Sequence, residues 1–163
     1  NDLAIAAHRL ASESERVLIV DCDVHQGDGT AALMAGRTDV ATYSIHAEKN
    51  FPARKARSTL DVPLADGVGD AAYMDALTTT LPGLVDAFGP TLILYQAGVD
   101  PWEGDRLGRL KLSREGLVAR DKWMAMLARQ RSLPLASALG GGYGHDAMEV
   151  SARHVASIMA LGS

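Results

Sequence analysis

Hydrophobic positions along the chain follow two periods, one typical of strands and one typical of helices. Short runs rich in Val, Ile and Leu predict buried strands, and longer segments with an apolar residue every three or four positions predict amphipathic helices. The predicted strands are 17–20, 40–45, 91–95 and 133–139, and the predicted helices are 3–11, 29–35, 70–88, 114–130 and 144–161. Because strands and helices alternate, we expect an α/β fold: three layers, α/β/α, around a mainly parallel sheet.

Two local signals refine this pattern. Ser113 precedes the helix that runs to about Gln130, and its hydroxyl is typical of a helix N-cap. Residues 46–69 show little periodicity and contain Pro52 and Pro63 among several basic residues. Since long irregular segments inside compact domains are usually functional or mobile, we interpret 46–69 as one long loop.

The composition fits one globular enzyme domain. With 163 residues, 47% hydrophobic and 22% charged, the chain can bury a single core. The net charge of −4 argues against nucleic acid as a partner, and no apolar run approaches the ~20 residues of a membrane span. The single cysteine, Cys22, cannot form an internal disulfide, so we expect it to pack against the sheet in a reducing, cytoplasmic compartment.

The strongest chemical signal follows the first predicted strand, where two carboxylates and an imidazole alternate at Asp21, Asp23 and His25. Alternate positions of an extended backbone face the same side, and open α/β sheets bind ligands at the carboxyl ends of their strands. These donors suit a Zn²⁺ site that keeps one position open for water. The alternative is an acidic strand end that caps the next helix, a role that Asp28 or Thr30 alone could fill.

Two other families place acidic residues after an apolar strand, and the sequence argues against both. Phosphatases of the haloacid dehalogenase type use Asp-x-Asp followed by x-Thr or x-Val, but the fifth position here is His25. Arginase-like enzymes hold two metals and need another Asp two residues after the His, where this chain has Gly27. We therefore expect a single metal ion.

Two further strand ends carry candidate chemistry. Asp100 follows the strand at 91–95 and Gly98, where a third metal ligand could enter the site. The strand at 133–139 is followed by three glycines, 140–142, and then by Tyr143. Consecutive glycines let the backbone approach a ligand closely, and a tyrosine on such a turn can donate its O–H to a developing oxyanion. The run lacks the Lys-Ser/Thr of a phosphate loop, which argues against nucleotide binding.

Four motifs, in this order and spacing, resemble the histone deacetylase family of zinc amidohydrolases. They are Asp21-Cys-Asp-Val-His-Gln-Gly-Asp-Gly-Thr30, Gln96-Ala-Gly-Val-Asp100, Asp105-Arg-Leu-Gly108 and Gly140-Gly-Gly-Tyr143. The segment 103–108 and the helix start after it look most like the class IV branch and its bacterial relatives. The likeness covers nearly the whole chain, so we interpret 1–163 as a partial histone-deacetylase-like catalytic domain.

The resemblance implies a role for individual residues. Asp23, His25 and Asp100 fall on the three zinc ligands, and Tyr143 falls on the tyrosine that polarises the amide carbonyl and stabilises the oxyanion. Asp21 falls on the acid that supports an active-site histidine.

The resemblance also implies two accessory sites. A structural monovalent cation, expected to be K⁺, would contact Asp21 and Ser44. Phe51, Gly141 and Gly142 would line the tunnel that receives the acyl-lysine.

The implied function is removal of acyl groups, such as acetyl, from lysine side chains or related amines by a metal-activated water. Substrates would be acyl-lysine proteins, peptides or small acylated amines. The alternative is a noncatalytic metal- or acyl-lysine-binding fragment or a partner subunit, against which the presence of Tyr143 argues. Family members carry a tandem His pair, which includes the general base, upstream of the Asn-Asp-x-Ala-Ile-Ala helix with which this chain opens. We therefore expect the N-terminal part of the domain to be missing and the chain alone to be inactive.

Overall fold

Strands and helices alternate, except that β3 follows β2 directly, along residues 1–12 and 15–163, the part of the chain that the computed structural model describes. The strands are β1 (Val17–Asp21), β2 (Val40–Ala47), β3 (Leu60–Leu64), β4 (Leu92–Gly98) and β5 (Leu135–Gly140). The helices are α1 (Asp2–Leu10), α2 (Asp28–Leu33), α3 (Asp70–Phe88), α4 (Arg114–Gln130) and α5 (Ala147–Leu161). The Ser113 hydroxyl accepts a hydrogen bond from Gly116 N, which confirms the predicted N-cap of α4.

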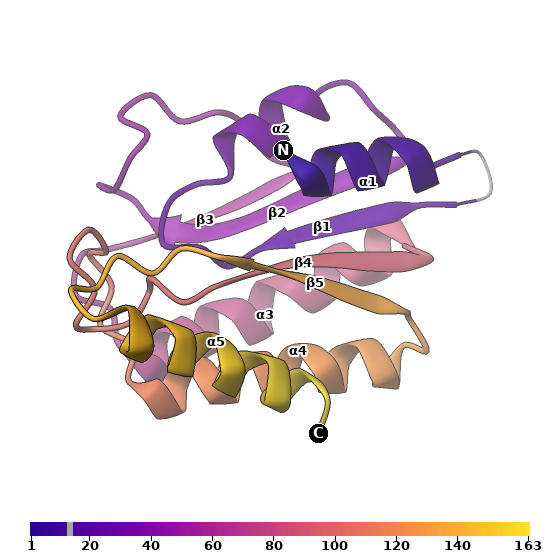
Figure 1. Cartoon of the computed structure of the whole chain (residues 1–163). Helices are drawn as coiled ribbons and strands as arrows, with labels where there is room; N and C mark the ends of the chain where they lie inside the picture. Colours follow the sequence, from indigo (N-terminus) through magenta and orange to yellow (C-terminus); the bar gives the residue numbers. More distant parts are fainter. Residues whose placement is uncertain (13–14) are drawn as a thin grey trace.

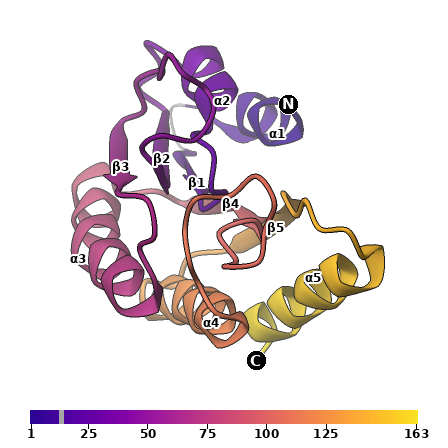
Figure 2. The ribbon, with the colours of Figure 1, turned by 90° about the vertical axis from the view of Figure 1, so that its left-hand side faces the viewer.

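The five strands form one parallel sheet in the order β3-β2-β1-β4-β5. Helices α1 and α2 cover one face, and α3, α4 and α5 cover the other (Figures 1 and 2). The predicted three-layer α/β/α fold is therefore confirmed. Because all strands run the same way, their carboxyl ends meet at one edge, on the left in Figure 1.

Strand β1 lies at the centre of the sheet and is buried on both faces. Leu18, Val20 and Cys22 belong to the larger hydrophobic cluster, while Val17 and Ile19 belong to the smaller one beneath α1. This two-sided burial explains why the strand reads as a continuous apolar run. Cys22 is fully buried, as the sequence predicted for a packing role.

Most element boundaries shift by a few residues from the prediction, and two differences bear on the fold. The segment predicted as one loop contains β3, in which Pro63 pairs with His46 of β2. β3 is an edge strand of this sheet, where a proline that cannot donate to a ladder is tolerated. Helix α5 begins at Ala147 rather than at 144, because Asp146 has an extended backbone and its side chain accepts a hydrogen bond from Met148 N as the N-cap.

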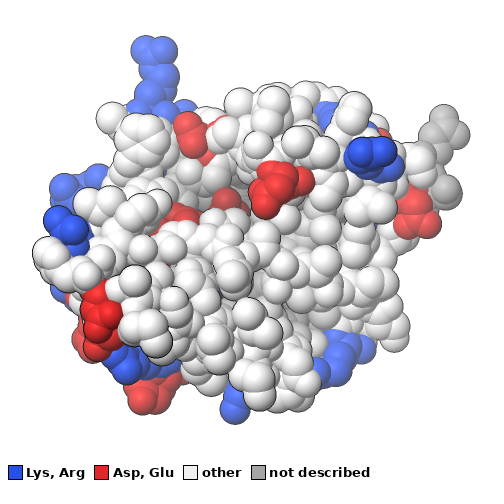
Figure 3. All heavy atoms as spheres, in the orientation of Figure 1, with Lys and Arg blue, Asp and Glu red and all other residues white. Residues whose placement is uncertain are grey.

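The surface over β5 and α5 carries few charged side chains in Figure 3. Leu139, Val155 and Met159 are exposed there. No helix in the described ranges is long and apolar enough to span a bilayer.

Candidate metal centre

Three side chains from two neighbouring strand ends converge at the carboxyl edge of the sheet. The candidate donor atoms of Asp23, His25 and Asp100 all lie within 4.8 Å of one another. His25 Nδ1 lies 3.0 Å from Asp23 Oδ1 and 3.2 Å from Asp100 Oδ2. The structure thus brings together the residues that the sequence predicts as metal ligands, although 75 positions separate His25 from Asp100.

The backbone bends after β1, and hydrogen bonds from its N–H groups to carboxylate oxygens stabilise these bends. The prediction of an extended backbone through His25 is wrong, because β1 ends at Asp21 and the next residues form bends. Asp23 N donates to Asp21 Oδ1 at 3.0 Å, and His25 N donates to Asp23 Oδ1 at 2.9 Å. Val24 N donates to Asp100 Oδ1 at 2.9 Å, which ties this bend to the end of β4. Local hydrogen bonds, not strand alternation, aim the donors at one another.

The carboxylates of Asp23 and Asp100 both stabilise the positive charge of a protonated His25. Hydrogen bonds to Asp100 and Asp23 raise the pKa of His25 to about 10. Burial raises the pKa of Asp100 to about 7, although the contact with His25 acts in the opposite direction. Burial would also raise the pKa of Asp23, but its hydrogen bonds with His25 bring that pKa below its ordinary value. The cluster therefore favours a cation at its centre, and a metal ion would displace the His25 proton.

The donor set fits Zn²⁺. Two carboxylate oxygens and one imidazole nitrogen are three protein ligands, as in catalytic zinc sites that keep a fourth position open. Asp100 Oδ2 is buried and, apart from its contact with His25, has no hydrogen-bond partner among the described residues. Gln96 Nε2 donates to Asp23 Oδ2 at 3.1 Å and fixes the second oxygen of that carboxylate.

Two glycines allow the backbone to approach the cluster. A Cβ on Gly98 would lie 2.6 Å from Asp23 Cα, and a Cβ on Gly141 would lie 2.5 Å from Asp100 Oδ2. Gly141 also has a φ of 63°, a conformation that glycine adopts without strain. These positions therefore have no room for a side chain while Asp23 and Asp100 keep their places.

Tyr143 stands beside the cluster on the turn after β5. Its ring meets the His25 ring edge to face, with 5.8 Å between centroids and an interplanar angle of 85°. The side chain remains 42% exposed. Partial burial and the nearby carboxylates of Asp23 and Asp100 raise the pKa of the phenol, so it stays protonated and can donate a hydrogen bond.

Asp21 and Ser44, the predicted cation contacts, lie opposite each other in the β1–β2 register. Burial, followed by the charge of Asp23, raises the pKa of Asp21 well above its usual range. Ser44 Oγ lies 3.0 Å from His46 Nδ1 and within 3.4 Å of Gly27 N. The two side chains are thus adjacent and buried, and a cation between them stays a prediction.

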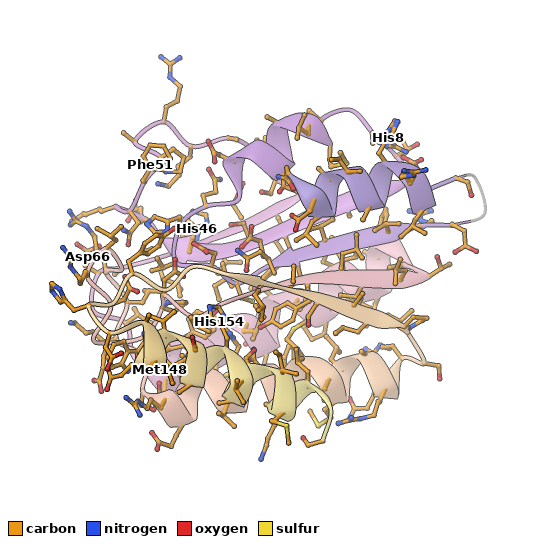
Figure 4. All side chains as sticks on the ribbon, viewed as in Figure 1. His8, His46, Phe51, Asp66, Met148 and His154 are labelled. Atoms are coloured by element: carbon orange, nitrogen blue, oxygen red, sulfur yellow. The ribbon has the colours of Figure 1, made fainter. Side chains whose placement is uncertain are left out.

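The three predicted tunnel residues, Phe51, Gly141 and Gly142, lie at different depths in the structure. Phe51 is 72% exposed on the loop after β2, and His46 lies deeper in Figure 4. Gly142 packs its backbone close to Val99 and Val150. The structure therefore places Gly141 against the candidate ligand Asp100 and Gly142 against Val99 and Val150, while Phe51 lies at the surface.

The histidines outside the cluster occupy different environments. His8 lies on α1 at the opposite end of the molecule from the strand ends in Figure 4, where it contacts Arg37 at 2.7 Å. His145 is exposed in a bend before α5, and His154 lies within α5. Burial lowers the pKa of His46 and of His154.

Sequence reasoning missed three residues that organise the site. Gln96 orients Asp23, Asp105 contacts the Tyr143 backbone, and Arg120 contacts the strand ends that carry the ligands. Gln96 and Asp105 belong to the motifs that carry the resemblance, but no local pattern pointed to their partners. Arg120 lies in the middle of α4, and the sequence signal for it is a charged residue among the apolar positions of the helix face that is buried.

Comparisons with known proteins agree on one family. Residues 1–159 match the histone deacetylase domain. The chain is 41% identical over 156 residues to an uncharacterized protein of Picosynechococcus sp., and 32% identical over 160 residues to histone deacetylase 2 of Arabidopsis thaliana. The chain therefore belongs to the histone deacetylase family, which confirms the resemblance; its closeness to the class IV branch stays a prediction.

The chain spans about half or less of the length of the relatives that it matches. The alignments cover 94% of this chain and 52% of the Picosynechococcus protein, and 95% of this chain and 40% of the Arabidopsis protein. A crystal structure of acetylpolyamine aminohydrolase from Burkholderia pseudomallei matches with a TM-score of 0.83 and 24% identity, over 100% of this chain and 49% of that one. This likeness shows a shared fold.

Proposed function

We propose that the protein to which this chain belongs is a zinc-dependent amidohydrolase that removes acyl groups, such as acetyl, from lysine side chains or related amines. Family membership supports hydrolysis of an acylated amine. The three donors at the strand ends support a metal centre. The acetylpolyamine aminohydrolase with the same fold supports small acylated amines as candidate substrates beside acyl-lysine proteins and peptides.

The observation that carries the proposal is the position of Tyr143 beside the candidate ligands. Zn²⁺ held by Asp23, His25 and Asp100 would supply Lewis-acid chemistry at the substrate carbonyl. The Tyr143 phenol, kept protonated by its raised pKa, would donate a hydrogen bond to the oxygen on which negative charge develops. A residue that only packed beside a binding pocket would have no need of this hydroxyl.

The remaining predicted residues would shape and support the site. Gly141 and Gly142 would form the tunnel wall nearest the ligands, and Phe51 would contact the substrate at the rim. Asp21 and Ser44 would hold a K⁺ ion behind the ligand segment. The pocket of about 350 Å³ lined by Asp21, Asp23 and His25 leaves two of the ligand side chains, Asp23 and His25, reachable from solvent, while Asp100 is fully buried.

The test compares the whole, zinc-loaded protein with its Tyr143→Phe variant. Acetate release is measured from an acetyl-lysine peptide and from an acetylpolyamine. We expect hydrolysis of at least one substrate and a fall in kcat of ~10-fold or more in the variant, since an oxyanion donor is commonly worth 10²–10³ in rate. Zinc content should stay the same. Absence of hydrolysis of both substrates would refute the proposed function, and an unchanged kcat would leave Tyr143 with a packing role only.

A further inference from the structure

We propose that Asp105 is a positioning residue that holds Tyr143 over the candidate metal centre. The inference rests on the proposed function, because it assigns a purpose to a contact made by the residue expected to donate to the oxyanion. Asp105 lies in the loop between β4 and α4, and Tyr143 lies on the turn between β5 and α5. The two segments are 38 positions apart in the sequence and meet at the carboxyl edge of the sheet.

The Asp105 carboxylate accepts hydrogen bonds from three backbone N–H groups. Oδ1 accepts from Leu107 N at 2.9 Å and from Gly108 N at 3.0 Å. Oδ2 accepts from Tyr143 N at 2.7 Å. In addition, Arg106 N donates to Tyr143 O at 3.3 Å. Both backbone polar groups of Tyr143 are therefore held by two consecutive residues of the other loop.

Tyr143 needs such an anchor because little else fixes it. The side chain is 42% exposed, and its described ring contact is the edge-to-face approach to His25. Gly141 and Gly142, which precede it, have φ values of 63° and 96° and impose few conformational limits of their own. Since a misplacement of ~1 Å can cost a catalytic group ~10²-fold in rate, a fixed backbone at Tyr143 matters for the reaction.

The same loop is tied to a candidate metal ligand. Asp100 lies near its start, two residues after the end of β4, and the backbone of Gly108 passes so close to the Asp100 carbonyl that a Cβ at Gly108 would overlap it. Asp105 thus ties the Tyr143 backbone to the segment that carries Asp100, which limits how far the two residues can move apart. Because the contact is made by the Tyr143 backbone, it does not depend on burial of the Tyr143 ring.

A carboxylate suits this role better than an amide. Asp105 presents two acceptor oxygens to three donors, whereas Asn presents one acceptor and one donor group. In Asp105→Asn, an N–H would face either the Tyr143 amide or the paired amides of Leu107 and Gly108. The variant keeps side-chain volume and loses at least one of these bonds. Glu103→Gln, an exposed position of the same loop, removes the same charge and serves as the matched control.

The first experiment measures amide hydrogen exchange at Tyr143 by NMR. We expect exchange in Asp105→Asn to be ~10-fold faster or more than in the wild type, because an exposed amide that loses its acceptor is no longer protected. Glu103→Gln should match the wild type. Asp105→Ser, which keeps one acceptor on a shorter side chain, is a second variant should the first fail to fold. An unchanged Tyr143 exchange rate in a folded Asp105 variant would overturn the proposal.

The second experiment is a double-mutant cycle in the whole protein with an acetyl-lysine peptide. Asp105→Asn should lower kcat ~10-fold or more with little change in KM, and should lower it no further in the Tyr143→Phe background. An equal loss in both backgrounds would overturn the assignment, since a general structural role does not depend on the Tyr143 hydroxyl. A wild-type protein that hydrolyses no acylated amine would refute the proposed function, and the exchange experiment would still decide whether Asp105 fixes Tyr143.

Discussion

The buried guanidinium of Arg120 donates a hydrogen bond to the carbonyl of Gly98 at 2.7 Å and contacts the carbonyl of Cys22 at 3.3 Å. Arg120 lies on α4 and is fully buried, and its Nε donates to Asp121 at 2.8 Å. Gly98 is the last residue of β4 and Cys22 directly follows β1, so both carbonyls lie just before the candidate ligands. The Arg120 side chain therefore links the ends of β1 and β4 from the side of the sheet that α4 covers.

We expect Arg120→Met to destabilise the protein strongly. The substitution keeps much of the side-chain volume but leaves Asp121 as a buried charge without its partner, which commonly costs ~3–5 kcal/mol. The matched control is Arg131→Met, since Arg131 pairs with Asp86 at the surface and such pairs contribute at most ~1 kcal/mol. Urea unfolding measures both. An equal free energy of unfolding in the two variants would contradict a clamping role for Arg120.

We expect Gly141→Ala to damage the candidate metal centre. Gly141 and Gly36 both have positive φ, 63° and 78°, so alanine at either position strains the backbone by ~1–2 kcal/mol. Only at Gly141 would the new Cβ also overlap the Asp100 carboxylate, because the space around Gly36 is open. Zinc titration should show a loss of affinity of ~10-fold or more in Gly141→Ala and none in Gly36→Ala. Equal zinc affinity in both variants would contradict this prediction, because displacement of the Asp100 carboxylate would then not weaken zinc binding.

We expect Cys22 to be inert in the folded protein. The side chain is fully buried, and burial raises its pKa to about 12. Because the thiolate is the reactive form, only roughly one thiol in ten thousand would be ionised at about pH 8. Reaction with iodoacetamide should be slow in buffer and complete in guanidinium chloride. Equally rapid labelling in both solutions would contradict the packing role.

The sheet could be predicted from sequence because each buried strand is a short apolar run next to a helical pattern. β3 escaped prediction because Asp61 and Pro63 interrupt the apolar run, and its position at the edge, paired with β2, is a property of the whole sheet. The local pattern contains no sign of that neighbour.

The convergence of Asp23, His25 and Asp100 was likewise predictable from sequence, since parallel strands place their carboxyl ends at one edge. The contacts of Asp105 and Arg120 were not, because they join residues 38 and up to 98 positions apart. Their partners are backbone groups, which every residue carries, so no residue type marks them. Such positions are defined only by the folded structure.

A metal centre made by Asp23, His25 and Asp100 underlies the proposed activity, and zinc binding to this chain tests it most directly. Bound zinc is measured by elemental analysis after equilibrium dialysis for the wild type, Asp100→Asn and the control Asp66→Asn, an exposed carboxylate that pairs with Arg109. We expect about one zinc per chain in the wild type and in Asp66→Asn, and a large loss in Asp100→Asn, because the amide removes a charge and a ligand oxygen. Equal zinc in all three proteins, or none in the wild type, would contradict the account.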